Sequence, residues 1–246
     1  ATLLSTIATG TGGVVTVTSA VNITGTTDQV IAALDTNGVI AATATITLDD
    51  TPSLANLKTI NDATAGSIKI ANGAQTYSGS AAVLAAALDG TVTDGSGNPL
   101  TGNMTLTAAG GNPNAVQLQT INNATTGSVI IPDKTVTLSG TRAVLVEALA
   151  GTVTNAASEK ITGTVTISAG GGDPDAAQLK TINDSIDGAI VVPSKAVALS
   201  GTAAVLAAAL AGTVTDAASA KIEGNVTISS APTEAELKTI NDGTNA

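Results

Sequence analysis

The chain lacks cysteine, histidine, phenylalanine and tryptophan, and it has a single methionine, Met104, and a single tyrosine, Tyr77. Without thiol or imidazole groups it has no cysteine nucleophile, no histidine base and none of the usual ligands of zinc, haem or iron–sulfur clusters. The scarcity of aromatic rings also removes the platforms on which proteins stack nucleic-acid bases. The composition therefore argues against an enzyme and against bound cofactors.

Positive charge is scarce as well. Nine Lys and Arg residues stand against 19 Asp and Glu residues in 246, which gives a net charge of −10. A surface of that sign repels phosphate backbones and anionic lipid headgroups, so we expect neither nucleic-acid binding nor membrane adsorption. No apolar run approaches the roughly 18 residues of a membrane span, so we expect no membrane insertion either.

What the chain does contain is a tandem repeat. A Thr-Ile-Asn-Asp/Asn motif begins at Thr59, Thr120, Thr181 and Thr239, in steps of 61, 61 and 58 residues by subtraction. The sequence therefore predicts repeats at 1–58 (a diverged copy), 59–119, 120–180 and 181–238, with 239–246 beginning the next. Because Leu4-Ser5-Thr6-Ile7 and the residues around Leu237 are versions of one motif, we expect the chain to be a block of a longer array.

Within one repeat the pattern predicts strand, strand, helix, strand, strand, helix. Thr202 is the expected N-cap of a helix that ends at Gly212, and in the preceding copy Asp173 is the expected N-cap with Pro174 at the first helical position. The β-branched and alternating segments predict strands at 189–192, 196–199, 213–215 and 225–228. Each repeat is thus two strand–helix halves.

Two architectures fit this pattern. In the first, an α/β repeat protein, units of about 60 residues form an elongated, solenoid-like stack with long parallel sheets. In the second, each repeat is a separate small α+β domain in a row. We expect the stack, because a unit of about 60 residues without aromatic side chains has a marginal core of its own, and no linker separates the repeats.

Comparison of the copies tests each candidate site. Asp173-Pro174-Asp175 is matched by Asn112-Pro113-Asn114 and Thr51-Pro52-Ser53, so charge is lost while helix-capping ability is retained. We therefore interpret Asp173 and Asp175 as capping residues. The alternative is a Ca²⁺ site that includes them or the single-copy pair Asp49 and Asp50, but calcium requires six to eight converging oxygens.

Other recurring residues also have structural interpretations. Asn61, Asn122, Asn183 and Asn241 are expected to cap helix C-termini and to form a ladder between stacked units. Gly79, Gly140 and Gly201 mark a repeated turn, and the serines before them, Ser78, Ser139 and Ser200, are expected to bond backbone there. Lys58, Lys180 and Lys238 indicate an exposed helix surface. Tyr77 and Arg142 each occur in one copy, which suggests surface variation.

The Leu-Lys/Gln-Thr-Ile-Asn-Asp/Asn stretches and the Ser-Gly-Thr/Ser-x-Ala-Val-Leu-x-x-Ala-Leu-x-Gly-Thr-Val-Thr segments cover nearly all of the chain. In these segments the chain resembles the tandem-repeat extender regions of giant Gram-negative surface adhesins exported by type I secretion (RTX-adhesin-like). Its composition also resembles S-layer proteins. The best-known extenders of the adhesin family are Ig-like sandwiches with Ca²⁺ at their junctions, and this sequence departs from them in its helices and in having no recurrent acidic junction.

The resemblance implies a structural spacer that projects an adhesive module from a bacterial cell surface. The expected location is then extracellular, the expected partners are neighbouring repeats of the same chain, and the expected form is a monomeric rod without catalytic site or cofactor. The alternative is a self-assembling, S-layer-like lattice protein.

Overall fold

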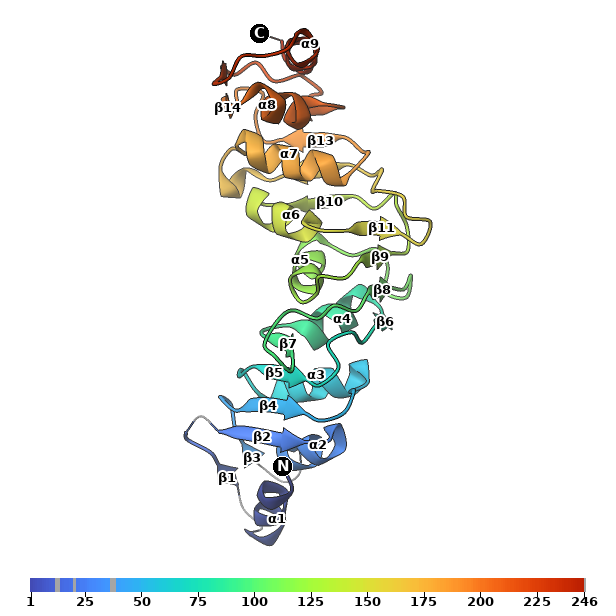
Figure 1. Ribbon diagram of the computed structural model, residues 1–246, viewed down its shortest axis with the longest axis vertical. Coiled ribbons are helices and arrows are strands. Elements are labelled where there is room, and N and C mark those ends of the chain that lie inside the picture. Colours follow the sequence, from blue (N-terminus) through green and yellow to red (C-terminus); the bar gives the residue numbers. More distant parts are fainter. Residues whose placement is uncertain (12–13, 20, 36–38, 246) are drawn as a thin grey trace. The chain divides into compact units, whose positions relative to one another are not determined.

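The computed structural model describes residues 1–246 except 12–13, 20, 36–38 and 246. It divides into two compact units. Unit 1 comprises residues 1–111 and 123–129, and unit 2 comprises residues 112–122 and 130–246. Both are α/β, with parallel strands alternating with helices along the chain (Figure 1).

Unit 1 contains four helices and the strands between them among its described residues. The elements are α1 (Thr2–Thr11), β1 (Val15–Thr16), β2 (Asn22–Gly25), α2 (Thr27–Asp35), β3 (Val39–Ile40), β4 (Thr45–Leu48), α3 (Leu54–Ala63), β5 (Ile68–Ile70), β6 (Tyr77–Gly79), α4 (Ala81–Leu88), β7 (Val92–Asp94) and β8 (Met104–Leu106). Each helix packs on the next along the chain, from α1 to α4.

Unit 2 repeats this order. The division between the units falls within α5 (Ala115–Asn123) and β9 (Val129–Ile131). The remaining elements are β10 (Leu138–Gly140), α6 (Arg142–Leu149), β11 (Val153–Asn155), β12 (Val165–Ile167), η1 (Ala169–Gly171), α7 (Ala176–Ser185), β13 (Ile190–Val192), β14 (Leu199–Gly201), α8 (Ala203–Leu210), β15 (Val214–Asp216), β16 (Val226–Ile228) and α9 (Glu234–Gly243). The predicted order of strands and helices is confirmed, although the strand expected at 196–199 begins only at Leu199.

The sheets join neighbouring repeats rather than separating them. In unit 1 the order β2-β4-β5-β7 is parallel throughout, and Ile46 of β4 lies opposite Ile68 of β5, across the predicted boundary at residue 58. In unit 2 the order is β10-β12-β13-β15, and Val165 lies opposite Ile190, across the boundary at 180. Within each unit, therefore, a sequence repeat is not a sheet of its own.

The core consists almost entirely of aliphatic side chains. Strands bury alternate residues, as in Ile68 and Ile70 of β5, and the helices bury Leu and Ile such as Leu57 and Ile60. The interpretation of Tyr77 as surface variation is wrong. It is 4% exposed at the position that Leu138 and Leu199 occupy in later copies, because the ring is apolar enough to replace leucine in the core.

Each half-repeat of two strands and a helix is called a coil below. Glycine allows close contact between successive coils. A Cβ atom added at any of six glycines would overlap the carbonyl oxygen of a residue in the preceding coil. The pairs are Gly66 with Ala44, Gly102 with Gln75, Gly127 with Gly102, Gly163 with Val136, Gly188 with Gly163, and Gly224 with Val197. Only a residue without a side chain fits at these points, and this recurring role was not predicted from the sequence.

Helix capping is confirmed, but the capping residue lies later than expected. The N-cap of α7 is Asp175, whose carboxylate accepts from the N–H of Gln178 in a capping box, so α7 begins at Ala176 rather than at Pro174. The equivalent N-caps are Ser53, Asn114 and Thr233. Pro174 therefore lies one residue before the N-cap and outside the helix.

A second set of caps starts the alanine-rich helices. Ser80, Thr141 and Thr202 accept from the N–H three residues later at the starts of α4, α6 and α8. This confirms Thr202 as an N-cap, and Gly212, at φ +88°, follows the end of α8. Ser78, Ser139 and Ser200 lie in the middle of their strands with exposed side chains, so the capping hydroxyl at this turn is two residues further on.

Candidate functional site

The recurring asparagines join successive helices. The Nδ2 of Asn61 in α3 donates to the carbonyl oxygen of Ala86 in α4 at 3.1 Å. Equivalent bonds run from Asn122 to Glu147 and from Asn183 to Ala208, both 2.8 Å. These carbonyls lie in the last turn of their helices, where backbone acceptors have no partner within the helix. Each asparagine therefore caps the following helix.

This geometry corrects one part of the sequence interpretation and confirms another. The asparagines lie inside their helices, and the described non-glycine residues with positive φ are Ser158 and Ser219, so a left-handed cap on their own helix is wrong. A bond from one coil to the next is confirmed, with a carbonyl rather than a second amide as acceptor. Asn241 in α9 is exposed, and α9 is the last helix described.

Open grooves lie beside two of these asparagines. One, of about 370 Å³, is lined by Asn61, Asp62, residues 64–66, Asp89 and Gly90. Another, of about 560 Å³, is lined by Lys160, Asn183, Asp184, residues 186–189, Ala208 and residues 211–213. Several of the charged groups at these grooves are paired: Lys58 pairs with Asp62, Lys180 with Asp184, and the Nζ of Lys160 donates to the carbonyl of Asp184 at 2.6 Å. The lysine positions are half-exposed or exposed, as predicted.

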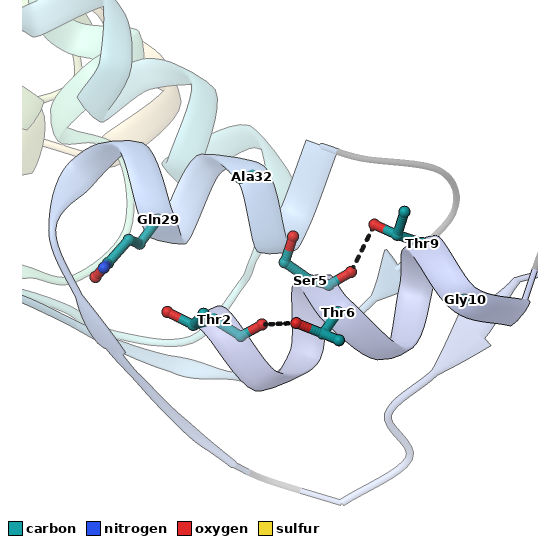
Figure 2. Close-up of a pocket in the computed structure, with 7 residues that line it drawn as sticks. All are labelled: Thr2, Ser5, Thr6, Thr9, Gly10, Gln29 and Ala32. Atoms are coloured by element: carbon teal, nitrogen blue, oxygen red, sulfur yellow. Dashed lines mark hydrogen bonds between the residues drawn. The ribbon is translucent and has the colours of Figure 1, made fainter.

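A third cavity, of about 520 Å³, lies between α1 and α2 (Figure 2). It is lined by Thr2, Ser5, Thr6, Thr9, Gly10, Gln29 and Ala32. Two of its hydroxyls are turned back onto their own helix, since Thr6 donates to the carbonyl of Thr2 at 3.0 Å and Thr9 to that of Ser5 at 2.8 Å. No residue of this lining is titratable, so the cavity holds no acid, base or activated nucleophile.

The α1–α2 cavity has a structural origin. Ile7 and Ile60 are 53 residues apart in equivalent motifs, so Ser5, Ala8 and Thr9 occupy the places of Lys58, Asn61 and Asp62. Short side chains therefore stand where α3 has a lysine–aspartate pair and a bridging asparagine. The cavity marks a missing contact between helices rather than a binding site of its own.

The four aspartates considered for calcium lie in separate contacts. The carboxylate of Asp50 accepts hydrogen bonds from the N–H and the hydroxyl of Thr27 at 2.8 and 2.6 Å. Asp50 belongs to the next coil, so these bonds join that coil to the first residue of α2. Asp175 is the N-cap of α7, and the carbonyl of Asp173 accepts from the guanidinium of Arg142. Asp49 bonds through its backbone N–H to Gly25 at 3.0 Å. Across the described residues no three His, Cys, Asp or Glu side chains are grouped to hold a metal.

A second recurring polar element was not predicted from the sequence. Asp94, Asn155 and Asp216 each accept two backbone N–H groups of the turn that follows, as Asp94 does from Ser96 and Asn98 at 2.9 and 2.8 Å. These backbone bonds hold the pKa of Asp94 below its usual value. The spacing of 61 residues is the signal that identifies the set, because the residue type varies between Asp and Asn.

The pKa is also shifted in capping or turn carboxylates, in surface ion pairs and in one buried phenol. Hydrogen bonds from the backbone N–H groups of Thr135 and Thr233 lower the pKa of Asp133 and of Glu236. Hydrogen bonding to Lys134 lowers the pKa of Glu159, and hydrogen bonding to Glu223 raises that of Lys195. Burial raises the pKa of Tyr77 to about 12. Its Oη has no hydrogen-bond partner among the described residues, and the raised pKa keeps the phenol protonated at neutral pH.

Two further findings bear on function. None of the helices in the described ranges combines the length and the apolar character that crossing a bilayer requires. Compared with known proteins, the chain matches no family model, no curated protein and no solved structure.

Proposed function

We propose that the chain is a structural spacer: a solenoid-like stack of about 60-residue repeats from the extender region of a giant bacterial cell-surface adhesin. In this role it holds an adhesive module away from the cell and carries out no chemistry. The observation on which the proposal rests is that sheets run across repeat boundaries within each unit. Adding a repeat to such a ladder adds length and core together.

The recurring residues support the same proposal. The asparagines bond the next helix, the glycines admit the preceding backbone, and the Ser, Thr, Asn and Asp caps start the helices. Each of these positions contributes to stacking one coil on another. An extracellular location and adhesion follow from the resemblance in sequence to the adhesin repeats.

Small-angle scattering tests the proposal on the chain and on a variant with one additional 61-residue copy. We expect an elongated particle whose maximum dimension grows by a fixed increment, with the same profile in EDTA. A compact particle, or one that keeps its maximum dimension when a repeat is added, would contradict the spacer. Sheet-like assemblies in electron micrographs would favour the lattice protein instead, and a profile that changes on chelation would establish a calcium requirement.

A further inference from the structure

The loop between β5 and β6 in unit 1 contains an Asn-Gly pair, Asn72-Gly73, at a turn. Asn72 is exposed. Its Oδ1 accepts from the N–H of Ala74 at 3.2 Å, and its carbonyl accepts from the N–H of Gln75 at 3.3 Å. A side-chain oxygen that bonds the backbone two residues further on is typical of asparagine and aspartate in turns. Asn72 therefore holds the turn through its side-chain oxygen.

The other copies show what this position requires. Asp133 and Ser194 follow Asn72 at intervals of 61 residues. The carboxylate of Asp133 accepts from the N–H of Thr135 at 2.9 Å, and the Oγ of Ser194 accepts from the N–H of Ala196 at 3.1 Å. The turn thus needs an oxygen acceptor, and it forms without a side-chain amide.

The glycine after Asn72 belongs to this copy alone, because Lys134 and Lys195 stand at the equivalent positions. A Cβ added at Gly73 would lie 2.5 Å from the Cβ of Asp94, so a side chain at residue 73 would force one of the two residues to shift. The N–H of Gly73 donates to no acceptor among the described residues. The main-chain nitrogen beside the Asn72 amide therefore has neither a side chain to shield it nor a hydrogen bond to hold it.

The carbonyl of Gly73 joins two coils. It accepts from the N–H of Thr101 at 2.7 Å and from that of Gly102 at 3.3 Å, both in the next coil. Beside this contact, a Cβ added at Gly102 would lie 1.9 Å from the carbonyl oxygen of Gln75. The two coils thus meet backbone to backbone, and the contact has no room for a longer main chain.

We propose that Asn72 is a site of spontaneous deamidation, with water as the co-reactant, and that the isoaspartate formed there loosens the contact between these two coils. The nitrogen of Gly73 attacks the Cγ of Asn72, so an N–Cγ bond forms, the Cγ–Nδ2 bond breaks, and ammonia leaves with the proton from the Gly73 nitrogen. Water then opens the succinimide ring. Cleavage of the bond to Cγ gives aspartate at position 72, and cleavage of the bond to the main-chain carbonyl carbon gives isoaspartate.

The two products differ in their effect on the contact. Aspartate keeps the turn, as Asp133 does in the next copy. Isoaspartate routes the main chain through its own Cβ and Cγ, which lengthens the backbone by one carbon and displaces the Gly73 carbonyl from Thr101 and Gly102. The equivalent contact in unit 2, from Thr162 and Gly163 to the carbonyl of Lys134, follows an aspartate and a lysine and is therefore spared. The spacer function does not depend on this chemistry.

Peptide mapping of the folded protein, incubated in mildly alkaline buffer and then denatured and digested with trypsin, tests the reaction. Cleavage after Lys69 and Lys134 releases peptide 70–134, which contains Asn72. We expect the mass gain of amide-to-acid conversion to accumulate in this peptide, together with isoaspartate labelled by a protein isoaspartate methyltransferase. Asn72→Ser is the matched control, because it carries the residue of the third copy, and it should abolish the mass gain.

Other reactive pairs in the chain are distinguishable. The second Asn-Gly pair, Asn37-Gly38, lies outside the described residues and in peptide 1–58. The Asp-Gly pairs at 89–90 and 94–95 isomerise without a change in mass. A folded protein that gains no mass in peptide 70–134, or an equal gain in Asn72→Ser, would overturn the proposed site.

Hydrogen exchange tests the effect on the coils. The isoaspartate form has one more negative charge and separates from the starting protein by anion exchange. We expect the N–H groups of Thr101 and Gly102 to exchange on the order of ten times faster in it, while those of Thr162 and Gly163 keep their rates. Freshly purified Asn72→Asp should exchange as the wild type does. Unchanged exchange at Thr101 and Gly102 in the isoaspartate form, or equal acceleration in Asn72→Asp, would contradict the loosening.

Discussion

At the scale of single residues, glycine sets how closely one coil approaches the next. Gly163 faces the carbonyl oxygens of Val136 and Thr135, and Gly188 faces that of Gly163, so consecutive coils of unit 2 meet backbone to backbone. Glycine is common in turns throughout the chain, and composition alone does not distinguish these positions. They became evident only from the contact between coils.

Gly163→Ala should therefore destabilise the protein strongly. The added methyl group meets main-chain oxygens that cannot move without disturbing the preceding coil, and we expect a loss on the order of 3 kcal/mol. Gly170→Ala is the control, because a Cβ at Gly170 has nothing within 4 Å. Urea unfolding measures both, and equal stabilities would contradict the packing role.

Tyr77 gives the protein a specific sensitivity to alkali. Its folded pKa of about 12 lies above the ordinary value of 10.0, because burial disfavours the phenolate. The neutral phenol is therefore compatible with folding at neutral pH, and stability falls as pH rises from 10 to 12. The shift corresponds to a loss of about 3 kcal/mol by pH 12.

Tyr77→Phe should lack this alkaline component and should be equal to or about 1 kcal/mol more stable than the wild type at pH 8, because it removes an unpartnered buried hydroxyl. Urea unfolding of both proteins at several pH values measures the difference. Tyr77 is the only tyrosine, so tyrosinate absorbance reports its titration directly. Ionisation at pH 10 in the folded protein would show that the ring is not buried.

At the scale of elements, the asparagine bridge links consecutive helices. Asn183→Ala leaves the carbonyl of Ala208 without its donor and should cost about 1 to 2 kcal/mol. Asn241→Ala is the control, because Asn241 is exposed in α9, the last helix that the structure describes, and we expect a loss of less than about 0.5 kcal/mol. Hydrogen exchange should quicken at the end of α8 in the first variant only, and equal exchange in both would contradict the bridge.

The turn after β7 is a second recurring element. Gly97, Ser158 and Ser219 are 61 residues apart and have φ of +87°, +61° and +63°, a conformation that glycine adopts without steric cost. Ser158→Gly should stabilise the protein by about 0.5 to 1 kcal/mol, and Gly97→Ser should destabilise it by a similar amount. Ser96→Gly, whose φ is not positive, should bring no gain. Thermal denaturation of the three variants measures this contrast.

At the scale of the whole molecule, the repeat predicts which deletions are tolerated. Removing residues 139–199 joins Leu138 to Ser200, a junction identical to that already present in the sequence. The product should fold, and its urea m-value should fall by about a quarter, in proportion to the residues removed. Removing residues 139–189 joins two strands out of phase and should abolish cooperative unfolding. Circular dichroism during urea titration distinguishes the two, and equal tolerance would contradict stacking in fixed register.

Much of the fold was predictable from particular residues. The order of strands and helices followed from short alternating segments and from runs such as Ala203–Leu210, and Thr202 was identified as a cap. The positions that were misplaced depend on more than local pattern. Asp173 and Asp175 both suit an N-cap, and the capping box with Gln178 selects the second. Tyr77 looks like a surface variant until its ring is seen to occupy a leucine position.

The repeat period, the alternation of strands and helices and the absence of the usual catalytic side chains were determined by the sequence itself, because they depend on local propensity and composition. Only the tertiary structure decided that neighbouring repeats share a sheet within each unit, that asparagine caps the following helix, and that glycine admits the preceding backbone. Those features join residues that lie 22 or more apart in the sequence, such as Ile46 and Ile68, and their partners depend on strand register. The composition lacks histidine, cysteine, phenylalanine and tryptophan. Strand register determined how the small residues that it does contain pack.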